Sequence, residues 1–122
     1  MNTSESKVMD ILKIYSDDDE SNKFIGWFVV IKHEGVSKPF IITYSKRKGK
    51  KYSVYDIINK RGDTKYKLSF GASKYQHYHD IIGGYDELNH EDERRKQLYY
   101  ARHGQSNDIN SAKFWSNLIL WS

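Results

Sequence analysis

The chain has 122 residues, of which 30% are charged and 38% are hydrophobic, and its formal net charge is +4. This length is typical of one domain, and the balance of charged and apolar residues is that of a globular protein rather than a disordered one. The absence of cysteine excludes disulfides, thiolate metal sites and thiol nucleophiles. No apolar run approaches the length of a membrane span, and the first ten residues lack the features of a signal peptide.

Charge is distributed unevenly along the chain. Residues 1–37 hold four basic and seven acidic residues (−3), residues 38–74 hold eleven and two (+9), and residues 75–122 hold five and seven (−2). The basic block favours a nucleic acid, an anionic lipid surface or an acidic protein as partner, although lysines on a sheet edge also prevent aggregation. The ten Tyr, five Phe and three Trp residues suit either a core or a partner-binding surface.

The first segment, 1–22, is predicted to be a short helix followed by an acidic linker. Apolar residues recur at helical spacing over residues 4–15, which predicts an amphipathic helix there. The acidic run at 17–20 is expected to be solvated.

Residues 23–71 are predicted to form a basic antiparallel meander of about four strands. Four runs are apolar or alternate with period two, which predicts strands over residues 24–33, 40–45, 51–58 and 65–70. Glycine-containing segments predict turns at 33–35, 46–50 and 59–64. The alternation predicts one polar, Lys-rich face, and Pro39 is expected at a strand start, where its missing N–H is tolerable.

Residues 72–122 are predicted to be helical. Asn89 can cap a first helix that has carboxylates in its first turn and ends before Gly104. Asn110 or Ser111 can cap a second helix with a wide apolar stripe. The predicted fold class is therefore α+β, a small antiparallel sheet followed by two C-terminal helices in a single domain.

Arg102-His103-Gly104 resembles the Arg-His-Gly signature of the histidine phosphatases, in which the His accepts a phosphoryl group and the Arg binds phosphate. That chemistry also needs a second Arg and a second His from later in the chain, and neither follows Gly104. Because a motif counts only in its structural context, we expect no catalytic residue and no enzymatic activity. A phosphatase-like hydrolase is the remote alternative.

A histidine pair offers the only hint of a metal site. His77 and His79 would point the same way on a strand, and His90 and His103 could complete a zinc site. The four positions lack a recognised ligand spacing, so surface histidines in a loop are the simpler interpretation. We therefore expect neither a metal nor another cofactor.

The basic hairpin is the first candidate binding surface. Its cations lie beside tyrosines, and such a combination can neutralise phosphates and stack on bases, or dock on an acidic protein. No recognised nucleic-acid-binding motif accompanies it. The predicted basic patch consists of Lys46, Arg47, Lys48, Lys50 and Lys51.

The C-terminal half carries an ordered set of motifs. These are Phe70-Gly71-Ala72, Arg94-Arg95-Lys96, Tyr99-Tyr100-Ala101-Arg102-His103, Ser111-Ala112-Lys113-Phe114-Trp115-Ser116 and Leu118-Ile119-Leu120-Trp121. Their order resembles a family of small uncharacterised proteins of nucleocytoplasmic large DNA viruses, which have Phe-Gly-Ala, Tyr-x-x-Arg-His and Thr-Ala-Gly-x-x-Ser-x-x-Leu-Trp segments. Lys113 stands where that family usually has Gly. The resemblance covers residues 68–122.

The resemblance implies a structural protein of the virion, assembled in the host cytoplasm. Its partners would be other capsid or virion proteins, and it would act as a minor capsid protein that cements or bridges larger capsid subunits. A nucleic-acid-binding accessory protein that uses residues 38–74 is the alternative, and the oligomeric state is not indicated. An aromatic–cationic cluster, either a core with an Arg at its rim or a binding surface, is expected from Tyr99, Arg102, His103, Phe114, Trp115 and Trp121.

Overall fold

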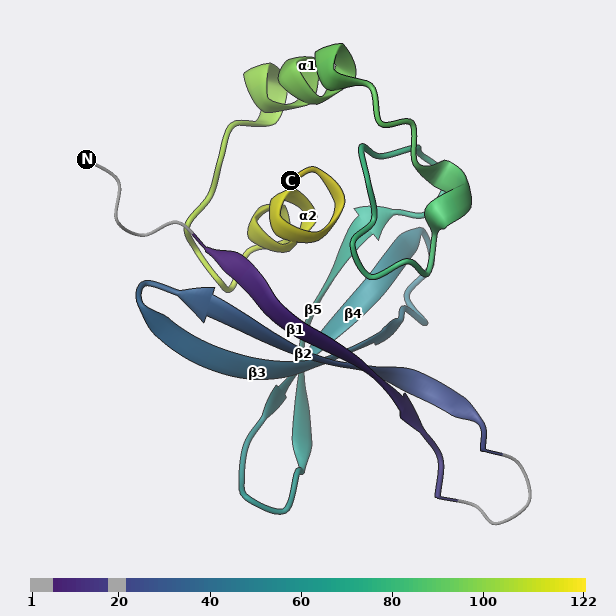
Figure 1. Cartoon of the computed structure of the whole chain (residues 1–122), viewed down its shortest axis with the longest axis vertical. Coiled ribbons are helices and arrows are strands. Elements are labelled where there is room, and N and C mark those ends of the chain that lie inside the picture. The colour runs from purple at the N-terminus through teal and green to yellow at the C-terminus, as the bar shows by residue number, and fades with distance from the viewer. Residues whose placement is uncertain (1–5, 18–21) are drawn as a thin grey trace.

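Five antiparallel strands form one sheet in which each strand pairs with its neighbours in the sequence. The computed structural model describes residues 6–17 and 22–122, and Figure 1 shows both helices on one side of the sheet. The predicted α+β class is confirmed, with five strands where about four were predicted. The elements are β1 (Lys7–Tyr15), β2 (Phe24–His33), β3 (Val36–Tyr44), β4 (Lys50–Ile57), β5 (Thr64–Ala72), the 3-10 helix η1 (Asp86–Leu88), α1 (Glu93–His103) and α2 (Ala112–Leu120).

Strand β1 stands where a helix was predicted, so that prediction was wrong. An extra residue at Met9 makes a bulge between Val8 and Asp10 in the pairing with β2. The bulge shifts the alternation by one position, so that Val8 and Ile11 both pack against the core although they are three residues apart. A helix shows the same spacing, which explains the wrong prediction. Residues 4–5 of the predicted helix and 18–20 of the acidic run lie outside the described residues.

The three predicted turns are confirmed. Glu34 and Gly35 connect β2 to β3 with φ angles of 52° and 80°, the pair of positive values that a two-residue type I′ hairpin requires. The basic hairpin between β3 and β4 turns through Gly49, whose φ is 83°. The loop from β4 to β5 is held by the Asn59 side chain, which accepts hydrogen bonds from the backbone N–H groups of Arg61 and Asp63.

Pro39 lies inside strand β3 rather than at its start, because the strand begins at Val36. It stands opposite Val30 of β2, and the pairing of β3 with β4 begins only at Phe40. Pro39 has no residue of β4 opposite it, so its missing N–H removes no hydrogen bond between β3 and β4. A proline is therefore tolerated inside this strand.

The core lies between the inner face of the sheet and α2 (Figure 1). Trp115 is fully buried at its centre, with its ring centroid 4.9 Å from that of Phe40 and 6.4 Å from that of Phe70. Its Nε1 donates a hydrogen bond of 2.8 Å to the carbonyl oxygen of Ile109, so the one polar atom of the ring is satisfied. Further buried apolar residues are Trp27, Val29, Ile31, Ile42, Tyr52, Val54, Ile82, Phe114, Leu118, Ile119 and Leu120.

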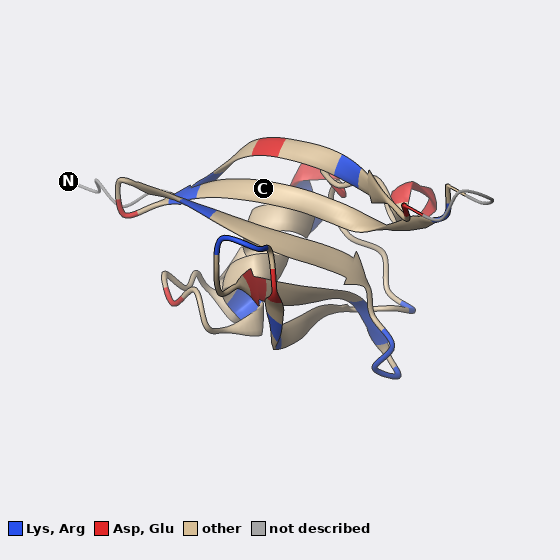
Figure 2. Cartoon of the chain, turned by 90° about the horizontal axis from the view of Figure 1, so that it is seen from below, with Lys and Arg blue, Asp and Glu red and all other residues tan. Residues whose placement is uncertain are grey.

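The centre of the outer face of the sheet is apolar, which corrects the prediction of a Lys-rich face. One continuous cross-strand row joins Leu12, Phe28, Ile41, Tyr55 and Tyr66, one residue from each strand. No helix in the described part of the chain covers this row (Figure 1). Figure 2 shows that the lysines and arginines gather instead at strand ends and hairpins.

The helix boundaries agree with the predictions except for the first cap. Asp92, not Asn89, caps α1, and its Oδ1 accepts hydrogen bonds from the N–H groups of Arg94 and Arg95. Glu91 has a φ of 52°, so no helix can run through it. Helix α1 ends at His103 with Gly104 as its C-cap, and Ser111 caps α2, both as predicted. None of the helices in the described chain is long and apolar enough to cross a membrane.

Replacing Trp115 by Ala should lower the free energy of unfolding by about 3–5 kcal/mol, because the ring is fully buried and its loss leaves a cavity. Urea unfolding of the variant and the wild type measures this difference. Trp115→Phe, which keeps most of the buried volume, should lose clearly less. Equal midpoints for all three proteins would contradict the central role of this ring.

Candidate ligand pocket

An open pocket of about 950 Å³ lies between α1, the end of β5 and the segment that follows it, with the end of α2 at its base. Four of its lining residues are formal cations, namely Lys51, Lys74, Arg95 and Arg102. The described residues that line it include no Asp and no Glu. Within the described chain, neither Lys74 nor Arg102 has an ion-pair partner, so the pocket is electropositive.

Lys51 forms part of the pocket wall although almost none of its surface is exposed. Its Nζ donates hydrogen bonds to the carbonyl oxygens of Ala72 and Tyr75, the latter at 2.8 Å. Burial lowers the pKa of Lys51 to about 8, and the charge of Asp80 opposes this shift. The side chain passes beside Gly71, where a Cβ would lie 2.9 Å from a methyl carbon of Leu120 and 3.3 Å from Lys51. Glycine is therefore required at this position, which also has a φ of 80°.

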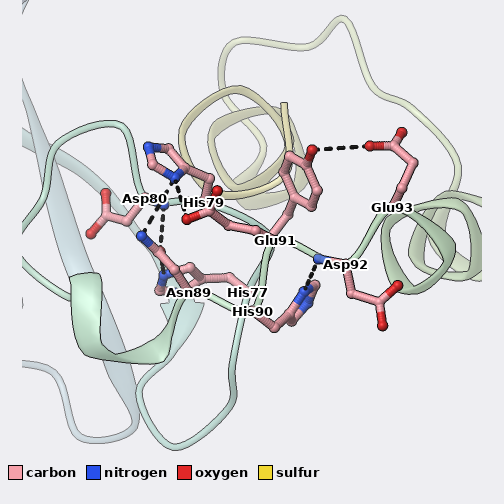
Figure 3. Close-up of polar contacts among 9 residues, drawn as sticks. His77, His79, Asp80, Asn89, His90, Glu91, Asp92 and Glu93 are labelled. Carbon is pink, nitrogen blue, oxygen red and sulfur yellow. Dashed lines mark hydrogen bonds and ion pairs between the residues drawn. The ribbon is translucent and has the colours of Figure 1, made fainter.

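His77 is the second buried polar residue of the wall. Figure 3 shows Asn89 between His77, His79 and Asp80. The Asn89 Oδ1 lies 2.7 Å from His77 Nε2 and accepts a hydrogen bond of 2.8 Å from the backbone N–H of Asp80. An acceptor at this position assigns the ring proton to Nε2, which leaves Nδ1 as a buried acceptor without a partner among the described residues. Burial and the charge of Lys51 lower the pKa of His77, so the ring is neutral at pH 7.

The segment that carries His77 is fixed by a buried carboxylate. Asp80 accepts a hydrogen bond of 2.5 Å from the hydroxyl of Tyr52 and further bonds from the N–H groups of Ile82 and Tyr85. The Tyr52 hydroxyl in turn accepts one from the N–H of Gly84. Burial, followed by the charge of Asp80, raises the pKa of Tyr52. A connection without regular secondary structure is thereby held rigid beside the pocket.

An aromatic wall closes the pocket on the side of the helices. The rings of Tyr99 and Trp121 stack with centroids 4.0 Å apart and planes 5° apart, and His103 lies 4.7 Å from Tyr99. The Tyr99 hydroxyl donates to Oδ1 of Asn117 at 2.8 Å, which ties α1 to α2. Burial raises the pKa of Tyr99 to about 12, so its hydroxyl stays protonated. These contacts fix the position of the wall.

The structure divides the predicted aromatic–cationic cluster in two. Tyr99, Arg102, His103 and Trp121 line the pocket together. Phe114 and Trp115 lie on the core face of α2 instead, because helical periodicity directs them toward the sheet. The pocket also brings a second Arg and a second His, Arg95 and His77, to the face that carries Arg102 and His103, although both precede them in the sequence.

The predicted basic patch is also divided. Lys46, Arg47, Lys48 and Lys50 are exposed at the β3–β4 hairpin, whereas Lys51 is buried and belongs to the pocket. The two positions lie next to each other in the sequence, but only Lys51 is covered by the segment that follows β5, whose Ala72 and Tyr75 carbonyl oxygens accept hydrogen bonds from its Nζ. The exposed patch therefore holds four cations rather than five.

A network of hydroxyl groups at the base of this hairpin was missed by the sequence analysis. Ser53 Oγ lies 3.0 Å from Ser45 Oγ and 2.7 Å from Ser69 Oγ, and the hydroxyl of Tyr66 lies 2.8 Å from Ser69 Oγ. The bond to Ser69 and the nearby Arg47 lower the pKa of Tyr66. The signal in the sequence was Ser53 and Ser69 at outward-facing strand positions and Ser45 directly after β3, and only the pairing of β4 with its neighbours brings the three together.

The histidines do not form a metal site in the described part of the chain, where no group of three His, Asp or Glu residues could hold an ion. His77 and His79 do not share a regular strand, because His77 makes only an isolated bridge with Asn89. His79 is half-exposed and lies 3.6 Å from the carboxylate of Glu91.

Comparison with known proteins gives no relative: no family model, no curated protein and no solved structure matches this chain.

The free energy of unfolding should rise between pH 8 and pH 10. Folding lowers the pKa of Lys51 from 10.5 to about 8. Between these two values the Lys51 amine is protonated in the unfolded chain and mostly neutral in the folded chain. Removing protons by raising the pH therefore stabilises the folded chain relative to the unfolded one. The expected rise is up to about 2 kcal/mol. Above pH 10 the trend reverses, because burial raises the pKa of Tyr52 and of Tyr99 and the unfolded chain then ionises first.

Urea unfolding at pH 7, 8.5 and 9.5 measures this rise. Lys51→Met removes the titrating group and should flatten the curve, whatever it does to stability at pH 7. Lys50→Met, at the exposed neighbouring position, is the matched control and should keep the rise. Parallel pH curves for the wild type and Lys51→Met would contradict the assignment.

Proposed function

We propose that this protein is a non-catalytic interaction protein that docks on another protein through the outer face of its sheet. The observation that carries the proposal is the uncovered row from Leu12 to Tyr66 across all five strands. Leu12 is 54% exposed and Tyr66 is 43% exposed. Contiguous exposed apolar surface of this kind is typical of protein interaction sites, whereas isolated apolar residues are not.

Charges around the row favour an acidic rim on the partner. Lys7 and Lys32 stand directly opposite each other on the outer face and are both exposed. Like charges at opposed strand positions destabilise a sheet, and an acidic partner would relieve this repulsion. Arg47 approaches Tyr66 at the other end of the row. A partner with an apolar patch bordered by carboxylates fits both ends.

The resemblance of residues 68–122 to the viral family supports a more specific form of this proposal. The chain would be a minor capsid protein of a large DNA virus, assembled in the host cytoplasm and retained in the virion. Its outer sheet face would lie against larger capsid subunits and cement or bridge them. A small protein with one covered and one uncovered sheet face suits this role, because only the covered face is needed for its own core.

Mass spectrometry of particles purified from the source of this sequence tests the capsid role. The protein should co-purify with the major capsid subunits at a fixed ratio and resist removal by high salt, because an apolar contact is not screened. Its absence from intact particles, or its release at moderate salt, would contradict the proposal.

Leu12→Glu should abolish retention in particles by burying a charge in the interface. Val36→Glu is the matched control, because Val36 is also 54% exposed but pairs with the inward-facing His33. Size-exclusion chromatography with light scattering shows whether a second copy occupies the face instead. A wild-type dimer that Leu12→Glu converts to monomer would assign the face to self-association and overturn docking on capsid subunits.

The alternative function, binding of nucleic acid, is favoured by one observation, the four exposed cations at the β3–β4 hairpin. If they neutralise four phosphates, the affinity for duplex DNA should fall with a log–log salt slope of roughly −3.6. Reversal of Lys46, Arg47 and Lys48 to Glu should then remove binding in a fluorescence anisotropy titration. Our proposal expects only weak binding at physiological salt, and tight, salt-sensitive binding would favour this alternative.

A further inference from the structure

The pocket beside α1 has two basic walls that face each other. Arg95, Leu98, Tyr99 and Arg102 follow the spacing i, i+3, i+4, i+7, so one stripe of α1 lines the pocket. The two arginines lie two helical turns apart, about 10.5 Å along the axis. The wall opposite α1 supplies Lys51 and Lys74 from β4 and the segment after β5.

These cations are not accounted for by contacts within the described chain. Arg95 donates a hydrogen bond of 3.0 Å to Oε1 of Gln76, a neutral group, and neither Arg102 nor Lys74 has a carboxylate partner. The Nζ of Lys51 uses two of its three N–H donors in hydrogen bonds to carbonyl oxygens. Collecting like charges in one concave site is unfavourable unless an anion neutralises them, and the low-dielectric walls strengthen the attraction for such an anion.

The size and aromatic content of the pocket narrow the ligand class. A volume of about 950 Å³ is at the upper end of the range for small-molecule sites. The pair of arginines suits two separate phosphate groups, because each guanidinium can bind one through two parallel hydrogen bonds. Tyr75 lies at the rim and is 73% exposed, so its ring offers a free face for stacking.

We propose that this pocket binds a small anionic ligand that carries several phosphates and a planar ring, a nucleoside triphosphate. The phosphates lie between Arg95, Arg102 and Lys74, and the base stacks on Tyr75. The inference is independent of the proposed function, because residues of α1 and α2 line the pocket and both helices lie on the side of the sheet opposite the docking face (Figure 1).

Isothermal titration of the full chain with ATP, tripolyphosphate and adenosine at low salt tests both parts of the proposal. ATP should bind most tightly, tripolyphosphate more weakly and adenosine weakest. Arg95→Glu and Arg102→Glu should each weaken ATP binding at least tenfold, because the reversal replaces an attraction by a repulsion. Arg94→Glu is the matched control, since Arg94 is exposed on the same helix but does not line the pocket, and it should change the affinity less than threefold.

Tyr75→Ala separates stacking from charge. It should weaken ATP binding roughly tenfold, the loss expected for one base–aromatic stack, and leave tripolyphosphate binding unchanged. The double variant Lys46→Glu and Lys48→Glu should retain ATP affinity, which excludes the hairpin as the binding site. Circular dichroism and thermal melting confirm that each variant is folded.

Three results would overturn the proposal. The first is no heat of binding with millimolar ATP. The second is an equal loss with Arg94→Glu and Arg102→Glu, which would show a general charge effect. The third is equal affinity for ATP and tripolyphosphate, which would remove the planar ring from the ligand class.

Discussion

The packing of α2 against the inner face of the sheet is the interaction on which the other features depend. Its buried side chains, with Trp115 at the centre, fill the space above β3 and β5. The carbonyl groups at its C-terminal end also fix the connection between β5 and η1, because the N–H groups of His79 and Ile81 donate hydrogen bonds to the carbonyl oxygens of Leu120 and Ile119. These carbonyls have no partner within the helix, so the loop satisfies them and is fixed at the same time.

The same helix positions α1, which buries none of its own residues fully. Tyr99 donates to the side chain of Asn117, and Tyr100 donates to the backbone carbonyl of Trp121. These bonds and the Tyr99–Trp121 stack hold α1 away from the sheet rather than on it. The space left between them is the pocket, so the cavity is a consequence of attaching α1 to α2 by its tyrosines.

In the described part of the chain, helices cover only one face of the five-stranded sheet. Because β2 and β3 carry apolar residues on both faces, apolar side chains on the other face are left in contact with solvent. Phe28 and Ile41 are partly shielded by their cross-strand neighbours, but no helix in the described chain reaches them.

Some of the residues that carry the viral resemblance also stabilise the fold. Gly71 makes room for Lys51, and Ser111 caps α2. Their presence is therefore explained by the fold as well as by any shared function.

The sequence by itself determined the strands β2 to β5, the turns between them, the end of α1 and the start of α2. These features follow from local causes, namely period-two alternation, glycine at positive φ and side-chain caps. It misassigned β1, because a bulge gives a strand the spacing of a helix. Asn89 was misassigned as a helix cap because an Asn side chain can bond to groups other than the N–H groups of a helix. Here its Oδ1 bonds to His77 and to the backbone N–H of Asp80.

The candidate sites were decided only by the tertiary structure. Lys50 and Lys51 are both lysines at neighbouring positions, yet Lys50 is exposed and Lys51 is buried, because the segment 72–77 covers Lys51 alone. The outer row and the pocket both join residues distant in the sequence. Strand register and the attachment of α1 to α2 bring those residues together, and neither is encoded in the local pattern of any one segment.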